Sequence, residues 1–313
     1  MTTPLRAITP RDQNPSDHAI QVRRVTRTFP GGVGIHDIDF TAKDRAVTAV
    51  IGPNGAGKTV LFSIIAGLLP ADSGQVTFGP GRSRVAYCPD VPQFEPWLTA
   101  LEVVETSLAI ARMRGTVTAR ESLELCGLGK VATRRVADFS RGMLQRLGIA
   151  AAIVLDPDVL ILDEPNSALD PIGRADIRAL ITEQKQHRCI VLSSHMLSEV
   201  EQLADDVVVI SDGRMIAHGT TTEILTDGLE PVWTIRLGAP IATTTETLVA
   251  EVPHMHLEFV TDTLCTARFT SFDTAATELT HALTLLGAPV IEVTLQDRDL
   301  DASFARIIQR QER

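Results

Sequence analysis

Lysine is scarce in this chain of 313 residues, because only four lysines stand beside twenty-five arginines. The formal net charge is −10, and residues 221–313 alone carry −8 of it. Proteins that bind nucleic acid show a clustered basic surface, so this balance argues against a nucleic-acid partner. Cysteine forms no C-x-x-C pair, and we expect each cysteine to be a small buried side chain in a reducing compartment. The four are Cys88, Cys126, Cys189 and Cys265.

Long apolar runs are also missing. No uncharged stretch approaches the ~18 residues of a membrane span, and the best run, residues 148–155, stops at Asp156. The first residues are polar and contain prolines, without the apolar core of a signal peptide. We therefore expect a cytoplasmic protein, long enough for about two domains.

One stretch has the pattern G-x-x-x-x-G-K-[ST], which holds phosphate. It consists of Gly52, Pro53, Asn54, Gly55, Ala56, Gly57, Lys58 and Thr59. Residues 46–51 before it predict a buried strand, and Val60, Leu61, Ile64, Ile65 and Leu68 after it have helical spacing. Backbone N–H groups and the new helix would cradle phosphates, with Lys58 reaching the β- and γ-phosphates and Thr59 holding Mg²⁺. Because lysine is so rare here, a chance match is improbable.

Two further apolar runs end in polar residues. Residues 159–162 lead into Asp163 and Glu164, and residues 189–193 lead into Ser194 and His195. The carboxyl edge of an open α/β sheet is where ligands bind, so Asp163 suits the Mg²⁺ shell and Glu164 can take a proton from an attacking water. Solvated strand-end acids and a structural histidine are the plain alternatives. The neighbouring phosphate loop favours the chemical interpretation, with His195 on a phosphate.

Elsewhere the pattern predicts alternating strands and helices. Residues 20–29 read as an edge strand, 99–128 as a helix, and 144–155 as a helix with Ser140 as N-cap. Phe29, at the end of the first strand, could stack on a purine or pack in the core. Asp212 and Gly213 indicate a hairpin turn.

The remaining segment, residues 226–313, has the order βαββαβ with a trailing helix, which predicts a small split-βαβ domain. Its weak helix spans residues 243–252 and its trailing helix residues 300–308. No catalytic constellation occurs in it.

The ordered motifs GPNGAGKT, FSRGM, VLILDE, SALD and SSH resemble those of ATP-binding-cassette (ABC) ATPases over residues 18–225. The resemblance implies an α/β P-loop cassette at residues 19–225 after a flexible start at 1–18, with an inserted helical subdomain at about 91–155. It also implies a dimer that sandwiches ATP. Ser140 and Gly142 would contact the γ-phosphate bound by the partner, Phe29 would stack on adenine, Asp170 would lie at the seam, and His195 would be the switch histidine.

Two positions depart from the family's commoner pattern. The signature reads F-S-R-G-M rather than L-S-G-G-Q, a form familiar from ATPases of drug, polysaccharide and lipid exporters. The loop after the strand at 84–87 presents Asp90 where a glutamine usually meets Mg²⁺ and water, and Gln93 is the alternative for that role. Residues 298–304 also resemble a closing motif of the same exporter ATPases.

The resemblance implies an ATP- and Mg²⁺-dependent subunit of an exporter for a drug, lipid or polysaccharide-like substrate. Its partners would be a separate membrane permease and a second copy of itself or a homologous ATPase, at the cytoplasmic face of the membrane. Most permease contact would fall between Asp90 and Ser140. The alternatives are an importer ATPase, which the signature and the second domain disfavour, and a soluble ABC ATPase acting on ribosomes or DNA, which one cassette and acidic charge disfavour.

Overall fold

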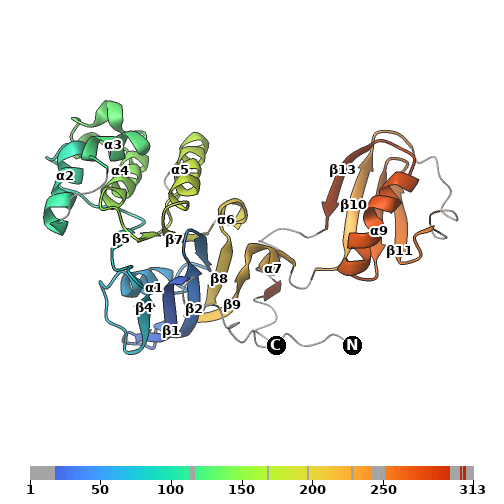
Figure 1. Cartoon of the computed structure of the whole chain (residues 1–313), viewed down its shortest axis with the longest axis horizontal. Helices are drawn as coiled ribbons and strands as arrows, with labels where there is room; N and C mark the ends of the chain where they lie inside the picture. Colours follow the sequence, from blue (N-terminus) through green and yellow to red (C-terminus); the bar gives the residue numbers. More distant parts are fainter. Residues whose placement is uncertain are drawn as a thin grey trace. The chain divides into compact units, whose positions relative to one another are not determined.

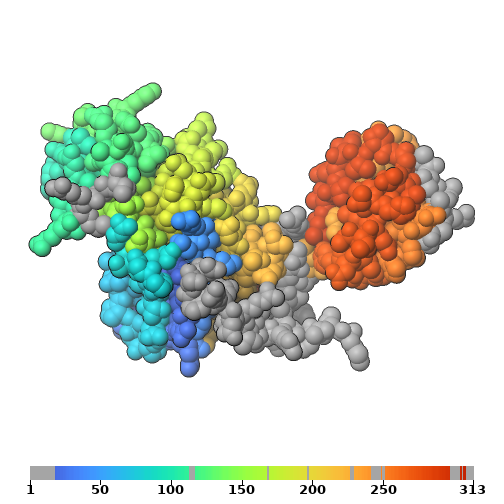
Figure 2. Space-filling view, in the orientation of Figure 1, coloured from blue at the N-terminus to red at the C-terminus, as the bar shows by residue number. Residues whose placement is uncertain are grey.

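The computed structural model describes residues 18–112, 117–167, 169–195, 197–226, 229–240, 248, 251–296, 304 and 306–307. Backbone contacts divide the chain into two compact units, with the boundary between Thr221 and Thr222. The ribbon and space-filling views show both units (Figures 1 and 2). Each unit is described by itself.

A mixed six-stranded sheet lies at the centre of the first unit, in the order β5-β6-β7-β3-β8-β9. The first five strands in this order run parallel, and β9 returns antiparallel to β8 through a turn at Asp212 and Gly213, as predicted. Strands β3, β6 and β7 are buried along their length, which is typical of strands covered on both faces. The strands are β3 (Val47–Ile51), β5 (Val85–Cys88), β6 (Val159–Leu162), β7 (Cys189–Ser194), β8 (Asp206–Ser211) and β9 (Arg214–Thr220).

A three-stranded antiparallel sheet completes the strands of this unit, in the order β2-β1-β4. Its members are β1 (His18–Thr28), β2 (Gly34–Lys43) and β4 (Ser73–Phe78). Strand β1 pairs on both sides, so the expectation of an edge strand at residues 20–29 is wrong. Its second partner, β4, arrives only after the phosphate loop and its helix, a distant pairing that local alternation does not reveal.

Helix α1 joins these sheets into one core. Leu61 and Phe62 from α1 belong to the same buried cluster as Phe40 from β2 and Val191 from β7. The phosphate loop is therefore anchored at both ends, by β3 and by α1. Outside residues 100–125, the described α-helices of this unit are α1 (Lys58–Ile65), α4 (Arg141–Ile153), α5 (Pro171–Gln184) and α6 (Leu197–Leu203), and α7 (Thr221–Thr226) begins at the boundary between the units.

The segment expected to form one helix over 99–128 forms two, α2 (Ala100–Ala111) and α3 (Ala119–Leu125). Arg112 adopts a left-handed conformation that ends α2. Thr118 and Glu121 then form a capping box that starts α3, which explains the interruption. The short turns η1 (Gly129–Val131) and η2 (Val136–Asp138) lead to α4, where Ser140 is the N-cap as predicted.

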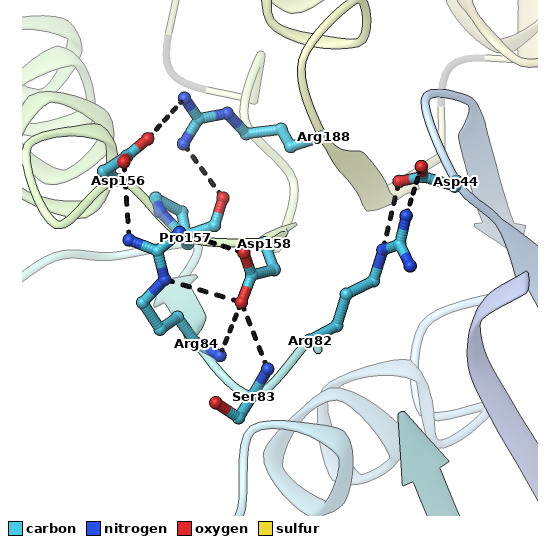
Figure 3. Close-up of polar contacts among 8 residues, drawn as sticks. All are labelled: Asp44, Arg82, Ser83, Arg84, Asp156, Pro157, Asp158 and Arg188. Atoms are coloured by element: carbon cyan, nitrogen blue, oxygen red, sulfur yellow. Dashed lines mark hydrogen bonds and ion pairs between the residues drawn. The ribbon is translucent and has the colours of Figure 1, made fainter. Parts of the chain in front are cut away.

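An ionic cluster ties together the amino ends of β5, β6 and β7 (Figure 3). The Asp158 carboxylate accepts the backbone N–H of Arg84 at 3.0 Å and pairs with its guanidinium at 3.0 Å. Arg188, largely buried, donates to the carbonyl of Pro157 at 3.1 Å and to Asp156 at 3.4 Å. This edge lies opposite the strand ends that carry Asp163, so the cluster fixes the alignment of the strands that present the site.

The second unit holds a four-stranded antiparallel sheet in the order β11-β12-β10-β13. Helix α9 (Phe272–Leu285) contributes to its core, and Trp233 meets the rings of Phe269 and Phe272 edge-on. The expected helices at 243–252 and 300–308, and the motif at 298–304, lie mostly outside the described residues. The strands are β10 (Val232–Leu237), β11 (Met255–Thr261), β12 (Leu264–Phe269) and β13 (Val290–Leu295).

All four cysteines are buried free thiols, which confirms that each is a small buried side chain. Burial raises the pKa of each thiol. Among the helices that the structure describes, none is long and apolar enough to cross a membrane.

Candidate functional site

The phosphate loop connects the buried end of β3 to the start of α1. A side chain at Gly52 would place its Cβ 2.1 Å from the carbonyl oxygen of Ile210, and one at Gly57 would place it 2.4 Å from Ile35. Gly57 also has φ 101°, a conformation that L side chains rarely adopt. The two glycines are thus required by packing and backbone geometry. The first N–H groups of α1 and its dipole then face the loop, which suits an anion.

Lys58 and Thr59 begin α1, and their side chains form hydrogen bonds to different groups. The Lys58 ammonium donates to the carbonyl oxygens of Gly52 at 2.8 Å and Pro53 at 3.3 Å, so it lies over the loop. The Thr59 hydroxyl donates to Asp163 Oδ2 at 2.7 Å. The predicted loop lysine and the predicted metal pair therefore come together in one place.

Asp163 follows β6 and is almost fully buried. Besides Thr59, it accepts the Ser193 hydroxyl on Oδ1 at 2.6 Å and the Tyr87 hydroxyl on Oδ2 at 3.3 Å. Burial, and next the charge of Asp163, raises the pKa of Tyr87, so its hydroxyl stays protonated and donates. A carboxylate beside a hydroxyl is a set of hard oxygen donors, which fits Mg²⁺.

Glu164 and His195 meet at the carboxyl ends of β6 and β7. The distance from Glu164 Oε2 to His195 Nδ1 is 2.7 Å. The Glu164 side chain is 14% exposed and that of His195 is 55% exposed. The carboxylate is therefore mostly buried, and the imidazole lies on its solvent side. Glu164 has φ 48°, and its backbone N–H donates to Ser193 Oγ at 2.8 Å.

The loop after β5 brings Asp90 next to Ser167, a residue that the sequence did not single out. Asp90 Oδ1 accepts the Ser167 hydroxyl at 2.6 Å. Ser167 lies in the segment between Glu164 and α5, so this contact links two loops at the same edge of the sheet. Gln93, the alternative residue for the metal-facing role, is exposed.

Three candidate nucleotide contacts lie at the ends of other elements. Phe29 follows β1, and the Arg27 guanidinium lies 5.2 Å from its ring centroid. Ser140 is exposed and its hydroxyl accepts the Met143 N–H at 3.3 Å. Asp170 is exposed and caps α5 by accepting the Gly173 N–H at 2.7 Å, and Pro171 follows it at the first helical position.

Sequence reasoning missed Ser193, Tyr87 and Ser167 among the residues that hold the acids. The available signals were weak. Tyr87 is the only tyrosine and stands near a strand end, and Ser193 precedes the Ser194–His195 pair. Neither signal says which strand lies beside β6, and that neighbour decides the contact.

A buried strand, a glycine-built phosphate loop, a helix, and an acid pair at the end of a parallel strand of the same sheet define a P-loop nucleoside triphosphatase. Residues 35–167 match the family described as ABC transporter. An uncharacterized ABC transporter ATP-binding protein, YxlF of Bacillus subtilis, is 32% identical over 212 residues, 66% of this chain and 72% of that protein.

Two other relatives extend the comparison. The lantibiotic transport ATP-binding protein SrtF of Streptococcus pyogenes is 35% identical over 208 residues, covering 63% of this chain and 89% of that protein. A solved structure of the ATP binding subunit of an ABC transporter has a TM-score of 0.60 and 27% identity, over 67% of this chain and 92% of that one. The chain belongs to the ABC transporter family of ATP-binding proteins, and its cassette is an ATPase. The predicted family is thereby confirmed.

Proposed function

We propose that this chain is the ATP-hydrolysing subunit of an exporter that works with a separate membrane permease. The observation that carries the proposal is the convergence of two pairs, Thr59 with Asp163 and Glu164 with His195, each 2.7 Å apart, at the edge of the sheet beside the phosphate loop. The S-R-G-M signature and the lantibiotic transport relative support export. The transported molecule would be a drug, lipid or polysaccharide-like compound.

Within the site each residue has a distinct task. The loop N–H groups and Lys58 would bind the β- and γ-phosphates, while Thr59 and Asp163 would hold Mg²⁺, which would neutralise phosphate charge. Glu164 orients the attacking water and accepts its proton, and His195 steadies the Glu164 carboxylate and reaches toward the transferred group. Phe29 and Val60 complete the adenine and phosphate side of the site.

Two copies would share each site. Ser140 and Gly142 begin α4, and the N-terminus of that helix can meet the γ-phosphate bound by the partner subunit. Asp170 is exposed at the start of α5, where it would lie along the seam. Because one chain supplies every motif, two identical subunits form two equivalent sites, although a homologous ATPase could replace one.

The region from about residue 91 to 155 would be an inserted helical subdomain that meets the permease at the cytoplasmic face of the membrane. It contains α2, α3 and α4 and carries large exposed apolar side chains. Trp97 is 65% exposed and Ile110 is 78% exposed. Buried against a permease, these side chains would be removed from water, which stabilises the complex.

The test is co-purification. We expect the chain to co-purify with a multi-span membrane protein encoded beside it, and ATP hydrolysis to change when both are placed in lipid. An importer would instead require a substrate-binding protein for this change. A chain that hydrolyses ATP alone and binds ribosomes or DNA would contradict the transporter assignment.

Asp90 offers a prediction about the loop after β5. Its bond to Ser167 places it beside the site, and its charge favours the metal while opposing the γ-phosphate. We expect Asp90→Ala to lower the hydrolysis rate about ten-fold, the lower range for residues that support a metal site. Asp90→Gln should stay active with an altered Mg²⁺ dependence. The measurement is the ATPase rate against Mg²⁺ concentration.

Ser167→Ala is the matched control, because it removes the same hydrogen bond and keeps the carboxylate. If Asp90 acts only through that bond, both variants lose activity equally and keep the Mg²⁺ dependence. An Asp90→Ala protein as inactive as Glu164→Gln would make Asp90 a catalytic acid and contradict our assignment.

Residues 226–313 would form an accessory domain of the split-βαβ, ferredoxin-like type. The strand order β11-β12-β10-β13 with every neighbour antiparallel supports this assignment. We expect a chain ending at Leu225 to bind ATP with unchanged affinity, because the phosphate loop and both acids precede it. Loss of ATP affinity in a truncated protein with normal circular dichroism would contradict this.

A further inference from the structure

Ser193 lies between the two acids of the site. Strands β6 and β7 are parallel neighbours with Leu162 opposite Leu192, so Asp163 and Ser193 follow at the same level. Ser193 is 0% exposed. Its hydroxyl donates to Asp163 Oδ1 at 2.6 Å and accepts the Glu164 N–H at 2.8 Å. A single hydroxyl thus donates its proton to the Asp163 carboxylate and accepts the backbone N–H of Glu164.

The bond to Glu164 supports an unusual backbone. Glu164 has φ 48°, in the left-handed region that residues other than glycine seldom occupy. Such a conformation persists only when its surroundings hold it. The Ser193 oxygen holds the N–H of this residue, and the side chain of the same residue lies 2.7 Å from His195. Ser193 therefore acts on the turn that aims the Glu164 carboxylate.

The bond to Asp163 has a counterpart on its other oxygen. Tyr87 and Thr59 both donate to Oδ2, while Ser193 donates to Oδ1. With donors on both oxygens the carboxylate plane is fixed. If Thr59 held a metal ion, Tyr87 and Ser193 would still hold Asp163, because neither residue belongs to the proposed metal shell.

We propose that Ser193 is a positioning residue that fixes the Asp163 carboxylate and the Glu164 backbone with one hydroxyl, and so couples metal binding to the placement of the catalytic base. This rests on the roles proposed for the two acids. A serine that served only to satisfy buried polar groups would affect folding without altering the dependence of hydrolysis on Mg²⁺.

The first experiment compares Ser193→Ala with a matched control. Thr48→Val also removes a fully buried hydroxyl from the neighbouring strand β3, and that hydroxyl has no hydrogen-bond partner among the described residues. We expect Ser193→Ala to lower kcat about ten- to hundred-fold and to raise the Mg²⁺ concentration needed for half-maximal rate, as loss of a supporting hydrogen bond around a metal site does. ATP affinity without Mg²⁺ should stay unchanged. Thr48→Val should change neither quantity.

The second experiment does not depend on activity. Tyr87 is the only tyrosine, so growth with 3-fluorotyrosine gives the protein a single ¹⁹F resonance beside Asp163. We expect Ser193→Ala to shift this resonance in protein free of nucleotide and metal, because the freed carboxylate rotates against the Tyr87 hydroxyl. Thr48→Val should leave the resonance in place.

Two further variants guard against misfolding. Ser193→Thr keeps the hydroxyl and should restore kcat, the Mg²⁺ dependence and the resonance. Ser193→Cys keeps the size but offers only a weak S–H donor, so it should resemble Ser193→Ala. The inference is overturned if Ser193→Ala, or Ser193→Cys where the alanine variant does not fold, keeps the wild-type Mg²⁺ dependence and resonance. If Glu164→Gln also turns over normally, the proposed function fails instead.

Discussion

Replacement of Glu164 by glutamine is expected to lower the steady-state rate of ATP hydrolysis about a thousand-fold, while ATP binding persists. Glutamine has the same shape and its amide can still contact His195, which lies 2.7 Å from the carboxylate. It can also touch water, but it cannot accept a proton. The phosphate loop and Asp163 are unchanged, so ATP and Mg²⁺ should still bind. A stable ATP-loaded dimer should therefore accumulate, visible by size-exclusion chromatography.

Glu183→Gln is the matched control, because it makes the same change at an exposed position on α5. It should hydrolyse ATP at the wild-type rate and show no ATP-dependent dimer. Near-normal turnover by Glu164→Gln would remove the residue from the role of base. Loss of ATP binding would show instead that the carboxylate supports the fold of the site.

The parts of the site that could be predicted from sequence are those set by local chemistry. The phosphate loop is one, because Gly52 and Gly57 occupy positions where a side chain would collide with Ile210 or Ile35. The strand-end acids are another, since a buried apolar run must deliver the polar residue after it to an edge of the sheet. Caps follow the same logic: Ser140 precedes its helix in a pattern that needs no distant partner.

The parts that could not be predicted depend on which strands become neighbours. The hydrogen bonds from Tyr87 and Ser193 to Asp163 exist because β5 and β7 flank β6, an order that no local pattern encodes. The central position of β1 was missed for the same reason. The contact between Asp90 and Ser167 joins residues 77 positions apart. The pairing of distant strands is stabilised by the packing of the whole fold, so a short window of sequence does not predict it.

Replacement of Ser140 by arginine is expected to block hydrolysis without weakening ATP binding to the isolated subunit. Ser140 is exposed at the start of α4, and in the proposed dimer it serves the site of the partner. An arginine there would fill the space of the γ-phosphate and keep that one site from closing. The variant also removes an N-cap, which costs about 1 kcal/mol of stability. Thr118→Arg controls for this loss, because it removes the N-cap of α3, and it should hydrolyse ATP normally.

The shared site predicts that two inactive variants restore each other. Ser140→Arg subunits keep Lys58, and Lys58→Ala subunits keep Ser140, so a mixed dimer has one intact site and one doubly damaged site. Equal mixing at random puts half of the subunits in mixed dimers, and we expect about one quarter of the wild-type rate if single sites act independently. The ATPase rate is measured across mixing ratios, with mixed dimers verified by two affinity tags.

If mixed dimers form and stay inactive, either the two sites must fire together or Ser140 does not act across the interface. A chain that carries both Ser140→Arg and Lys58→Ala separates these outcomes. Paired with a wild-type subunit, it leaves no intact site if each site is shared, and one intact site if each site belongs to a single subunit.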